Sequence, residues 1–244
     1  MRTLTLRRPI SLLASVALIL AVATPALAAP HRTYQVTITN LTSGQALTPP
    51  LIATHRGSTQ LFEVGTAASA GTQAIAENGD LAPLMASLAA DRGVSDFVAG
   101  SAPLVPEGTP LFGTFSDSVT LTISAGPGAQ FISYESMLVC TNDGFTGVDS
   151  LKLPNRIGAS VTVFGAGYDA GTEVNTEDFA DIVPPCQDLI GIGSDDAGTG
   201  ASNPALAEGN VIHHHPGIQG GDDLVPGVHG WTDPVVMITV VRSS

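Results

Sequence analysis

Residues 34–39 read YQVTIT, in which Tyr34, Val36 and Ile38 alternate with polar residues. A period of two places one set of side chains in the interior and the other in water, as in a β-strand buried on one face. Further short apolar stretches separated by turns rich in Gly and Pro cover residues 51–54, 97–99, 119–124, 131–138, 160–164 and 234–241. Strands at this spacing predict a mainly β protein built as an antiparallel β-sandwich.

One or two short helices are expected between the second and third of these strands. The first covers roughly residues 67–78 and ends at Gly79, because glycine readily adopts the left-handed conformation that closes a helix. The second follows Asp80 as its N-cap and carries apolar residues on one face until Gly93 ends it. Residues 191–210, rich in Gly, Ser, Asp, Ala and Thr, predict a solvated or mobile loop.

The composition limits both the fold and the partners. With 27 Gly, 17 Pro and 13% charged residues, the chain is unlike a coiled coil or a helical bundle, and 43% hydrophobic residues suffice for a core. Acidic residues outnumber Lys and Arg by 22 to 9, and the basic residues form no stripe along the sequence. Nucleic acid is therefore not expected as a partner. No linker or internal repeat divides residues 29–244, which we expect to form a single domain.

The N-terminus has the features of a secretory signal peptide over residues 1–28. Three arginines precede an apolar run over residues 10–22, and Ala26, Leu27 and Ala28 form a small-residue cleavage site. The run is too short for a membrane span, so no transmembrane segment is expected. We therefore expect a protein that is secreted or resides in the periplasm or cell envelope.

Cys140 and Cys186 are the two cysteines of the chain. In an oxidising compartment a disulfide is favoured over two free thiols, and a bond closing a loop of this length stabilises by roughly 4 kcal/mol in the chain-entropy model. The other interpretation is a pair of buried free cysteines.

Two stretches are rich in oxygen ligands, and each follows a predicted strand: residues 142–154 (NDGFTGVDSLKLP) and 168–173 (YDAGTE). Asp143, Asp169 and Glu173 would repel one another in their ionised forms unless a cation, a base or water screens them. Since neither stretch contains a thiolate or imidazole, a hard divalent cation such as Ca²⁺ suits them. Ordinary solvated acidic loops are the alternative.

Four stretches, in this order, resemble the spondin N-terminal domain family in its bacterial form: residues 49–55 (PPLIATH), 61–80 (LFEVGTAASAGTQAIAENGD), 142–154 and 168–173. The resemblance extends over nearly all of the chain after the signal peptide. It implies a C2-like β-sandwich with short helices that binds one Ca²⁺ between loops. Animal relatives belong to extracellular-matrix proteins that mediate cell adhesion.

The resemblance also implies a set of calcium ligands. Asp143 stands at the acidic position of the family's first loop, Asp169 begins the DAGTE block, and Glu173 closes that block with a longer carboxylate than the Asp of animal members. Asn142 and Asp149 are further candidate ligands in the first stretch.

Residues 211–224 read VIHHHPGIQGGDDL and suggest a different metal site. In an extended strand His213 and His215 share one face, and with Asp222 or Asp223 they have the ligand types for zinc, copper or iron. The resemblance instead favours a structural, hydrogen-bonded role for His215.

The sequence contains no Walker loop, GxGxxG or HExxH motif. Together these observations predict an exported calcium-binding module without catalytic activity, which serves adhesion or binds an extracellular protein or polysaccharide. The alternative is a metal-dependent enzyme or redox protein centred on His213 and His215.

Overall fold

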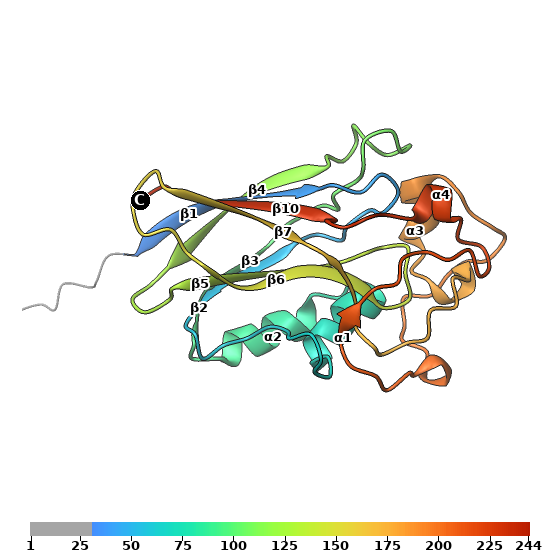
Figure 1. The fold of residues 1–244 in the computed structure, drawn as a ribbon, viewed down its shortest axis with the longest axis horizontal. Helices are drawn as coiled ribbons and strands as arrows, with labels where there is room; N and C mark the ends of the chain where they lie inside the picture. Colours follow the sequence, from blue (N-terminus) through green and yellow to red (C-terminus); the bar gives the residue numbers. More distant parts are fainter. Residues whose placement is uncertain (1–30) are drawn as a thin grey trace, which may run out of the picture.

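The computed structural model describes residues 31–244, so the predicted signal peptide lies outside the described residues. Two antiparallel sheets face each other (Figure 1). One has the strand order β4 (Ser118–Ala125), β1 (Arg32–Asn40), β10 (Val236–Arg242), β7 (Ser160–Gly165). The other has the order β3 (Val94–Ala99), β2 (Leu51–His55), β5 (Phe131–Met137), β6 (Gly144–Lys152), β8 (Gly167–Asp169), β9 (His213–His214). The prediction of a mainly β, antiparallel sandwich is confirmed.

Each predicted strand coincides with an observed one, but β6, β8 and β9 were not predicted. The most consequential error concerns residues 144–152, which were interpreted as part of a ligand-bearing loop and form strand β6. The first four residues of β6 are all buried, because this strand lies within the six-stranded sheet between the other sheet and the helices. A strand covered on both faces lacks the alternation of apolar and polar residues that identifies a strand in a sequence.

Two helices, α1 (Ala70–Asn78) and α2 (Ala82–Ala90), cover the outer face of the six-stranded sheet (Figure 1). α1 begins later than predicted because Ser69 is its N-cap and accepts a hydrogen bond from the Thr72 N–H. It ends as predicted at Gly79, whose φ is 65°. The predicted N-cap of α2 was wrong by one residue: Leu81 occupies that position, and Asp80 Oδ1 accepts a hydrogen bond from the Ala82 N–H at 2.9 Å.

Two further helices, α3 (Pro185–Ile190) and α4 (Pro226–His229), raise the number of α-helices above the one or two expected. Residues 191–210 contain one short 3₁₀ turn, Pro204–Leu206, and are otherwise irregular, in line with the loop predicted there. Within residues 31–244, no helix has the length and apolar character needed to cross a bilayer.

The interior has two apolar clusters, one on each side of the six-stranded sheet. Between the sheets, Tyr34, Val36 and Ile38 of β1 pack against Ile52 and Tyr134, as the alternation in residues 34–39 predicted. On the other side, Phe145 and Ile75 belong to the cluster formed with the helices. The two sheets and the helical layer therefore pack into three layers, and the loops lie at the ends of the strands.

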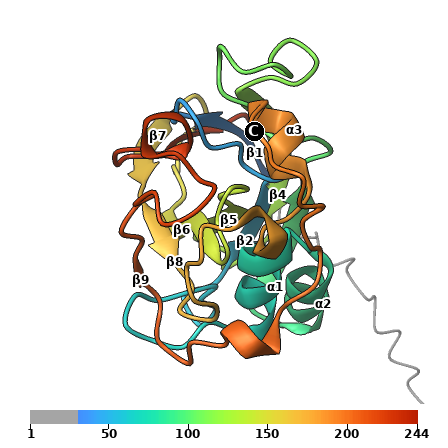
Figure 2. The same ribbon diagram turned by 90° about the vertical axis from the view of Figure 1, so that its right-hand side faces the viewer.

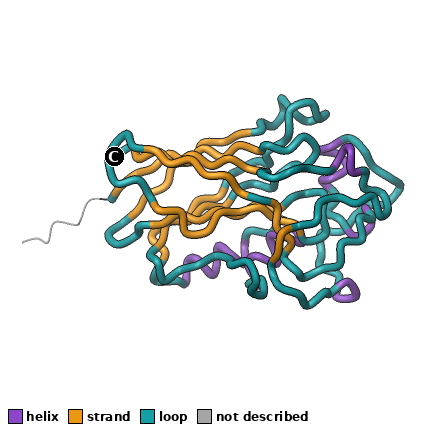
Figure 3. Tube along the Cα trace, in the orientation of Figure 1, coloured by secondary structure: helices purple, strands orange, loops and turns teal. Residues whose placement is uncertain are grey.

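The strands define two ends of the molecule. Residues 170–235, with α3, α4 and β9, lie at one end, which we call the loop end (Figures 2 and 3). At the opposite end, which we call the terminal end, β1 begins and β10 ends (Figure 1). The Cys140–Cys186 disulfide ties the turn after β5 to α3 at the loop end, and both cysteines are fully buried. The predicted disulfide is confirmed, and the alternative of two free thiols is wrong.

Candidate metal centre

The two acidic stretches meet at the loop end because β6 and β8 are neighbours in the sheet. Gly144 lies opposite Asp169 in the antiparallel register, and the Ala170 N–H donates to the Asp143 carbonyl oxygen at 3.1 Å. Asp143 and Asp169, far apart in the sequence, are therefore close in space.

Asp143 is fully buried, and its two carboxylate oxygens have different surroundings. Oδ2 accepts hydrogen bonds from the Thr172 N–H at 2.7 Å, the Thr172 hydroxyl at 3.0 Å and the Glu173 N–H at 3.0 Å. Oδ1 is buried and has no hydrogen-bond partner among the described residues. Burial, reinforced by the charge of Asp169, raises the pKa of Asp143 to about 6. The bonds to Oδ2 fix the carboxylate in place and leave Oδ1 free to bind a cation.

Asp169 is also buried, and backbone geometry holds its carboxylate in place. Oδ1 accepts a hydrogen bond from the Gly171 N–H at 2.8 Å, and Oδ2 accepts one from Asn175 Nδ2 at 2.6 Å. Gly171 has a φ of 70°, and a Cβ there would lie 2.7 Å from the Val211 carbonyl oxygen. Glycine at this position therefore lets the segment that leads into β9 approach the acidic turn.

Glu173 lies at the edge of the same cluster. Its Oε1 accepts a hydrogen bond from the Asn203 N–H at 2.6 Å. Burial, followed by the charges of Glu77, Asp143 and Asp181, raises the pKa of Glu173 to about 7. Glu77 and Asp181 were not recognised from the sequence. The sequence pattern that could have indicated Glu77 is its position on the predicted helix, four residues after Gln73. In the structure the Gln73 amide donates a hydrogen bond to Glu77 Oε1 at 2.7 Å.

Within residues 31–244, no Lys or Arg side chain pairs with these acids. In residues 31–244 the ion pairs within 4.0 Å involve His213 with Asp169 and His214 with Asp233, and none joins an acid to Lys or Arg. Buried carboxylates without a basic partner favour protonation or a bound cation.

The two second-rank candidates have different environments. Asn142 holds the 173–177 segment in place, since its Oδ1 accepts from the Thr176 N–H at 3.1 Å and its Nδ2 donates to the Thr176 hydroxyl. Asp149 lies six residues beyond Asp143 along β6, about 20 Å away at the usual rise of a strand. Its carboxylate accepts from the Leu61 N–H at 2.8 Å and the Ser133 hydroxyl at 2.9 Å. The structure does not bring Asp149 to Asp143, Asp169 or Glu173.

His213 lies beside Asp169 rather than beside Asp222. His213 is opposite Asp169 in the β8–β9 register, with Nδ1 at 3.8 Å from Asp169 Oδ1. His215 packs on Trp231, and its Nδ1 accepts a hydrogen bond from the Gly217 N–H at 3.0 Å. Burial lowers the pKa of His215 to about 4, so the ring is neutral at pH 7. The hydrogen bond that Nδ1 accepts assigns the ring proton to Nε2, which is buried and has no hydrogen-bond partner in residues 31–244. Neither nitrogen then offers a free lone pair to a metal.

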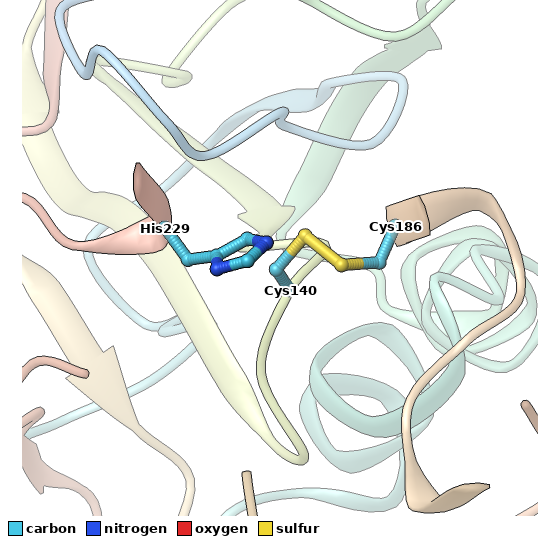
Figure 4. Close-up of side chains that lie close together, drawn as sticks. All are labelled: Cys140, Cys186 and His229. Carbon is cyan, nitrogen blue, oxygen red and sulfur yellow. A yellow bond between two sulfur atoms is a disulfide. The ribbon is translucent and has the colours of Figure 1, made fainter. Parts of the chain in front are cut away.

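The acids after this cluster do not complete the predicted histidine site. Asp222 is exposed, and Asp223 Oδ2 accepts a hydrogen bond from the Phe179 N–H at 3.1 Å. Within the described chain, two groups of three metal-ligand residues have ligand atoms within 4.8 Å of one another: Cys140, Cys186 and His229, and Asp178, Asp196 and Asp223. Figure 4 shows that the first is the disulfide with the His229 ring beside it. Neither the predicted trio of His213, His215 and Asp222 nor the predicted trio of Asp143, Asp169 and Glu173 is such a group.

No family model matches this chain, and no curated protein matches it. The chemistry of the loop end is therefore the basis for a functional assignment.

Proposed function

We propose that this chain is an exported calcium-binding module in which Ca²⁺ at the loop end is bound by Asp143, with Asp169 and Glu173 as the other acidic ligands. The observation that carries the proposal is the Asp143 Oδ1 atom, which is buried, has no hydrogen-bond partner within residues 31–244 and lies near the charge of Asp169. A free carboxylate oxygen held in a fixed orientation is a suitable ligand for a hard cation.

The donor set favours calcium over a transition metal. Asp143, Asp169 and Glu173 offer carboxylate oxygens, whereas His215 Nδ1 already accepts a hydrogen bond from the Gly217 N–H. His213 Nδ1 lies beside Asp169 but is also 2.9 Å from the Val211 carbonyl oxygen, and a single imidazole falls short of the two or more nitrogen or sulfur ligands of a usual zinc site. The resemblance of residues 142–154 and 168–173 to the spondin family supports the same ion.

In this proposal the ion is a structural clamp. Binding to the folded state alone stabilises it by about 2.7 kcal/mol when free Ca²⁺ is a hundredfold above the dissociation constant. Extracellular modules bind Ca²⁺ at about 0.1 to 1 mM, which suits an exported protein. The clamp would order residues 170–235 as a rigid surface for an extracellular protein or polysaccharide, and the module would act by binding, without catalysis. The buried disulfide supports export, because such bonds persist in oxidising compartments.

The substitution Asp143→Asn tests the clamp directly. Wild-type protein should show a higher melting temperature in Ca²⁺ than in chelator, and the variant should lose this difference and bind Ca²⁺ at least tenfold more weakly. Asp169→Ala should lower calcium affinity and melting temperature together, because it removes an anionic ligand that the site cannot replace. Calorimetric titration and thermal unfolding measure the two effects.

The matched control is Asp195→Asn, which removes one negative charge from an exposed position in the 191–210 loop. It should leave calcium affinity unchanged. If Asp143→Asn and Asp195→Asn gave the same calcium-dependent melting curves as wild type, the calcium site would be elsewhere or absent.

Elemental analysis of protein purified without a His tag separates the calcium proposal from a metalloenzyme built on His213 and His215. We expect calcium, and no stoichiometric zinc, copper or iron. One transition-metal ion per chain, lost in His213→Ala, would favour the alternative and contradict the proposal.

A further inference from the structure

The basic residues of this acidic protein gather at one place in the fold. Six of the nine Lys and Arg residues lie in the described part of the chain, and all six are at the terminal end: Arg32, Arg56, Arg92, Lys152, Arg156 and Arg242. They are scattered along the sequence, but the antiparallel register places the starts of β1, β3, β5 and β7 beside the ends of β2, β4, β6 and β10. The acidic cluster around Asp143 lies at the opposite end (Figure 1).

A polar pocket of about 340 Å³ opens among these residues. Its walls are the side chains of Arg32, Lys152, Gln130 and Asn155 and the turn formed by residues 126–128. Among residues 31–244, no Asp or Glu lines it. Asp91 and Asp96 lie at the same end, and their carboxylates accept hydrogen bonds from Thr59, Gly93 and Ser124 rather than from a basic side chain.

Neutral carbonyl groups hold the arginines around the pocket. Arg32 donates to the Ala129 carbonyl oxygen, and Arg56 donates to the Pro127 carbonyl oxygen at 3.4 Å. A Cβ on Gly128 would lie 3.3 Å from Arg56 Nε, so glycine here allows the guanidinium group to pack against the turn. These contacts orient the positive charges without neutralising them.

The charge of the pocket is uncompensated. Across residues 31–244, no Lys or Arg forms an ion pair with an acid within 4.0 Å, although acids outnumber Lys and Arg by more than two to one in the whole sequence. Like charges held together without counter-ions destabilise the fold unless a ligand supplies the negative charge. The occupant that this geometry suits is therefore an anion.

We propose that this pocket binds a phosphate group, carried either by free phosphate or by the headgroup of an anionic phospholipid. Guanidinium groups bind phosphate oxygens through paired N–H donors, and the Lys152 ammonium group adds a point charge. The amides of Gln130 and Asn155 supply neutral donors on the same walls. Because the rest of the surface is acidic, long-range attraction of polyanions is weak, and contacts within the pocket carry the affinity.

The test compares two variants that alter charge at the same end of the molecule. Arg56→Gln with Lys152→Gln changes an exposed wall residue, Lys152, and the exposed Arg56, which donates to the 126–128 turn. Arg92→Gln changes an exposed residue that neither lines the pocket nor donates to that turn. Inorganic phosphate is titrated at low ionic strength by calorimetry, and co-sedimentation is measured with vesicles of phosphatidylglycerol and phosphatidylcholine or of phosphatidylcholine alone. Chelator is present throughout, so the result is independent of the calcium site.

We expect wild type and Arg92→Gln to bind at least one phosphate probe, the double variant to bind at least tenfold more weakly, and added salt to weaken binding. Binding of inorganic phosphate without vesicle binding identifies free phosphate as the source. Binding only to vesicles that contain phosphatidylglycerol identifies the headgroup.

The proposal is overturned if wild type binds neither probe. It is also overturned if Arg92→Gln loses as much affinity as the double variant, since diffuse charge would then explain the binding. Lys152→Gln alone provides a second variant, and equal melting temperatures establish that the variants fold.

Discussion

Replacing Cys140 and Cys186 together by alanine should lower the free energy of unfolding by roughly 4 kcal/mol. The two residues are 46 positions apart, and their bond joins the turn after β5 to α3. Without this bond the unfolded chain gains conformational freedom, and α3 loses its covalent connection to the sheet. Urea denaturation of the double variant and of oxidised wild type measures the difference.

The disulfide variant should also bind Ca²⁺ more weakly, because Cys140 lies three residues before Asp143 in the same turn. Wild type treated with a thiol reductant under native conditions is the matched control. Both cysteines are fully buried, so native protein should keep its midpoint of unfolding, whereas protein reduced in urea should behave like the variant. An unchanged midpoint in the double variant would show that the bond adds no stability.

The parts of the fold that were predictable from the sequence are those whose residues alternate. β1 shows an apolar interior face and a polar exterior face, and its extent was predicted closely. β6 contains Gly144 and Gly147 and is buried on both sides at its start, so its sequence resembles a loop. β8 and β9 have three and two residues, and their existence depends on pairing with neighbours rather than on local propensity.

The sequence shows which acids belong to the candidate metal centre, but their arrangement in space depends on strand pairing. Asp143 and Asp149 belong to one acidic stretch, and the extended backbone of β6 separates them. The hydrogen bond that occupies His215 Nδ1 comes from a turn whose geometry the residue types do not determine. The grouping of basic residues at the terminal end could not be predicted for the same reason. Arg32, Lys152 and Arg242 are far apart in the sequence, and only the antiparallel topology places them at one end of the molecule.

Glu135 should make the protein less stable as the pH rises. This side chain is fully buried on β5, with Oε1 accepting a hydrogen bond from the Thr72 hydroxyl at 3.4 Å and Oε2 without a partner among the described residues. Burial raises its pKa from 4.5 to about 8, against a small opposing effect of Thr72, and the charge of Asp149 adds to the increase. The folded protein therefore keeps a proton that the unfolded chain releases at lower pH.

The sign of the effect follows from this difference in bound protons. Between pH 4.5 and 8 the folded state binds more protons than the unfolded state, so the free energy of unfolding decreases as pH rises, by at most about 1.4 kcal/mol per pH unit. Glu135→Gln replaces the neutral acid with an amide of similar shape and removes this dependence. We expect the variant to match wild type near pH 4.5 and to be more stable by roughly 4 kcal/mol at pH 8.5.

Urea denaturation of wild type and Glu135→Gln across this pH range measures the difference directly, because contributions from other titrating groups are common to both proteins. Glu63→Gln is the control, since Glu63 is exposed and should show no pH-dependent difference from wild type. If the stability difference between wild type and Glu135→Gln were constant with pH, Glu135 would be ionised in the folded protein and would require a positive partner. In residues 31–244 no Lys or Arg lies within ion-pair distance of it, so a bound cation would be the remaining candidate.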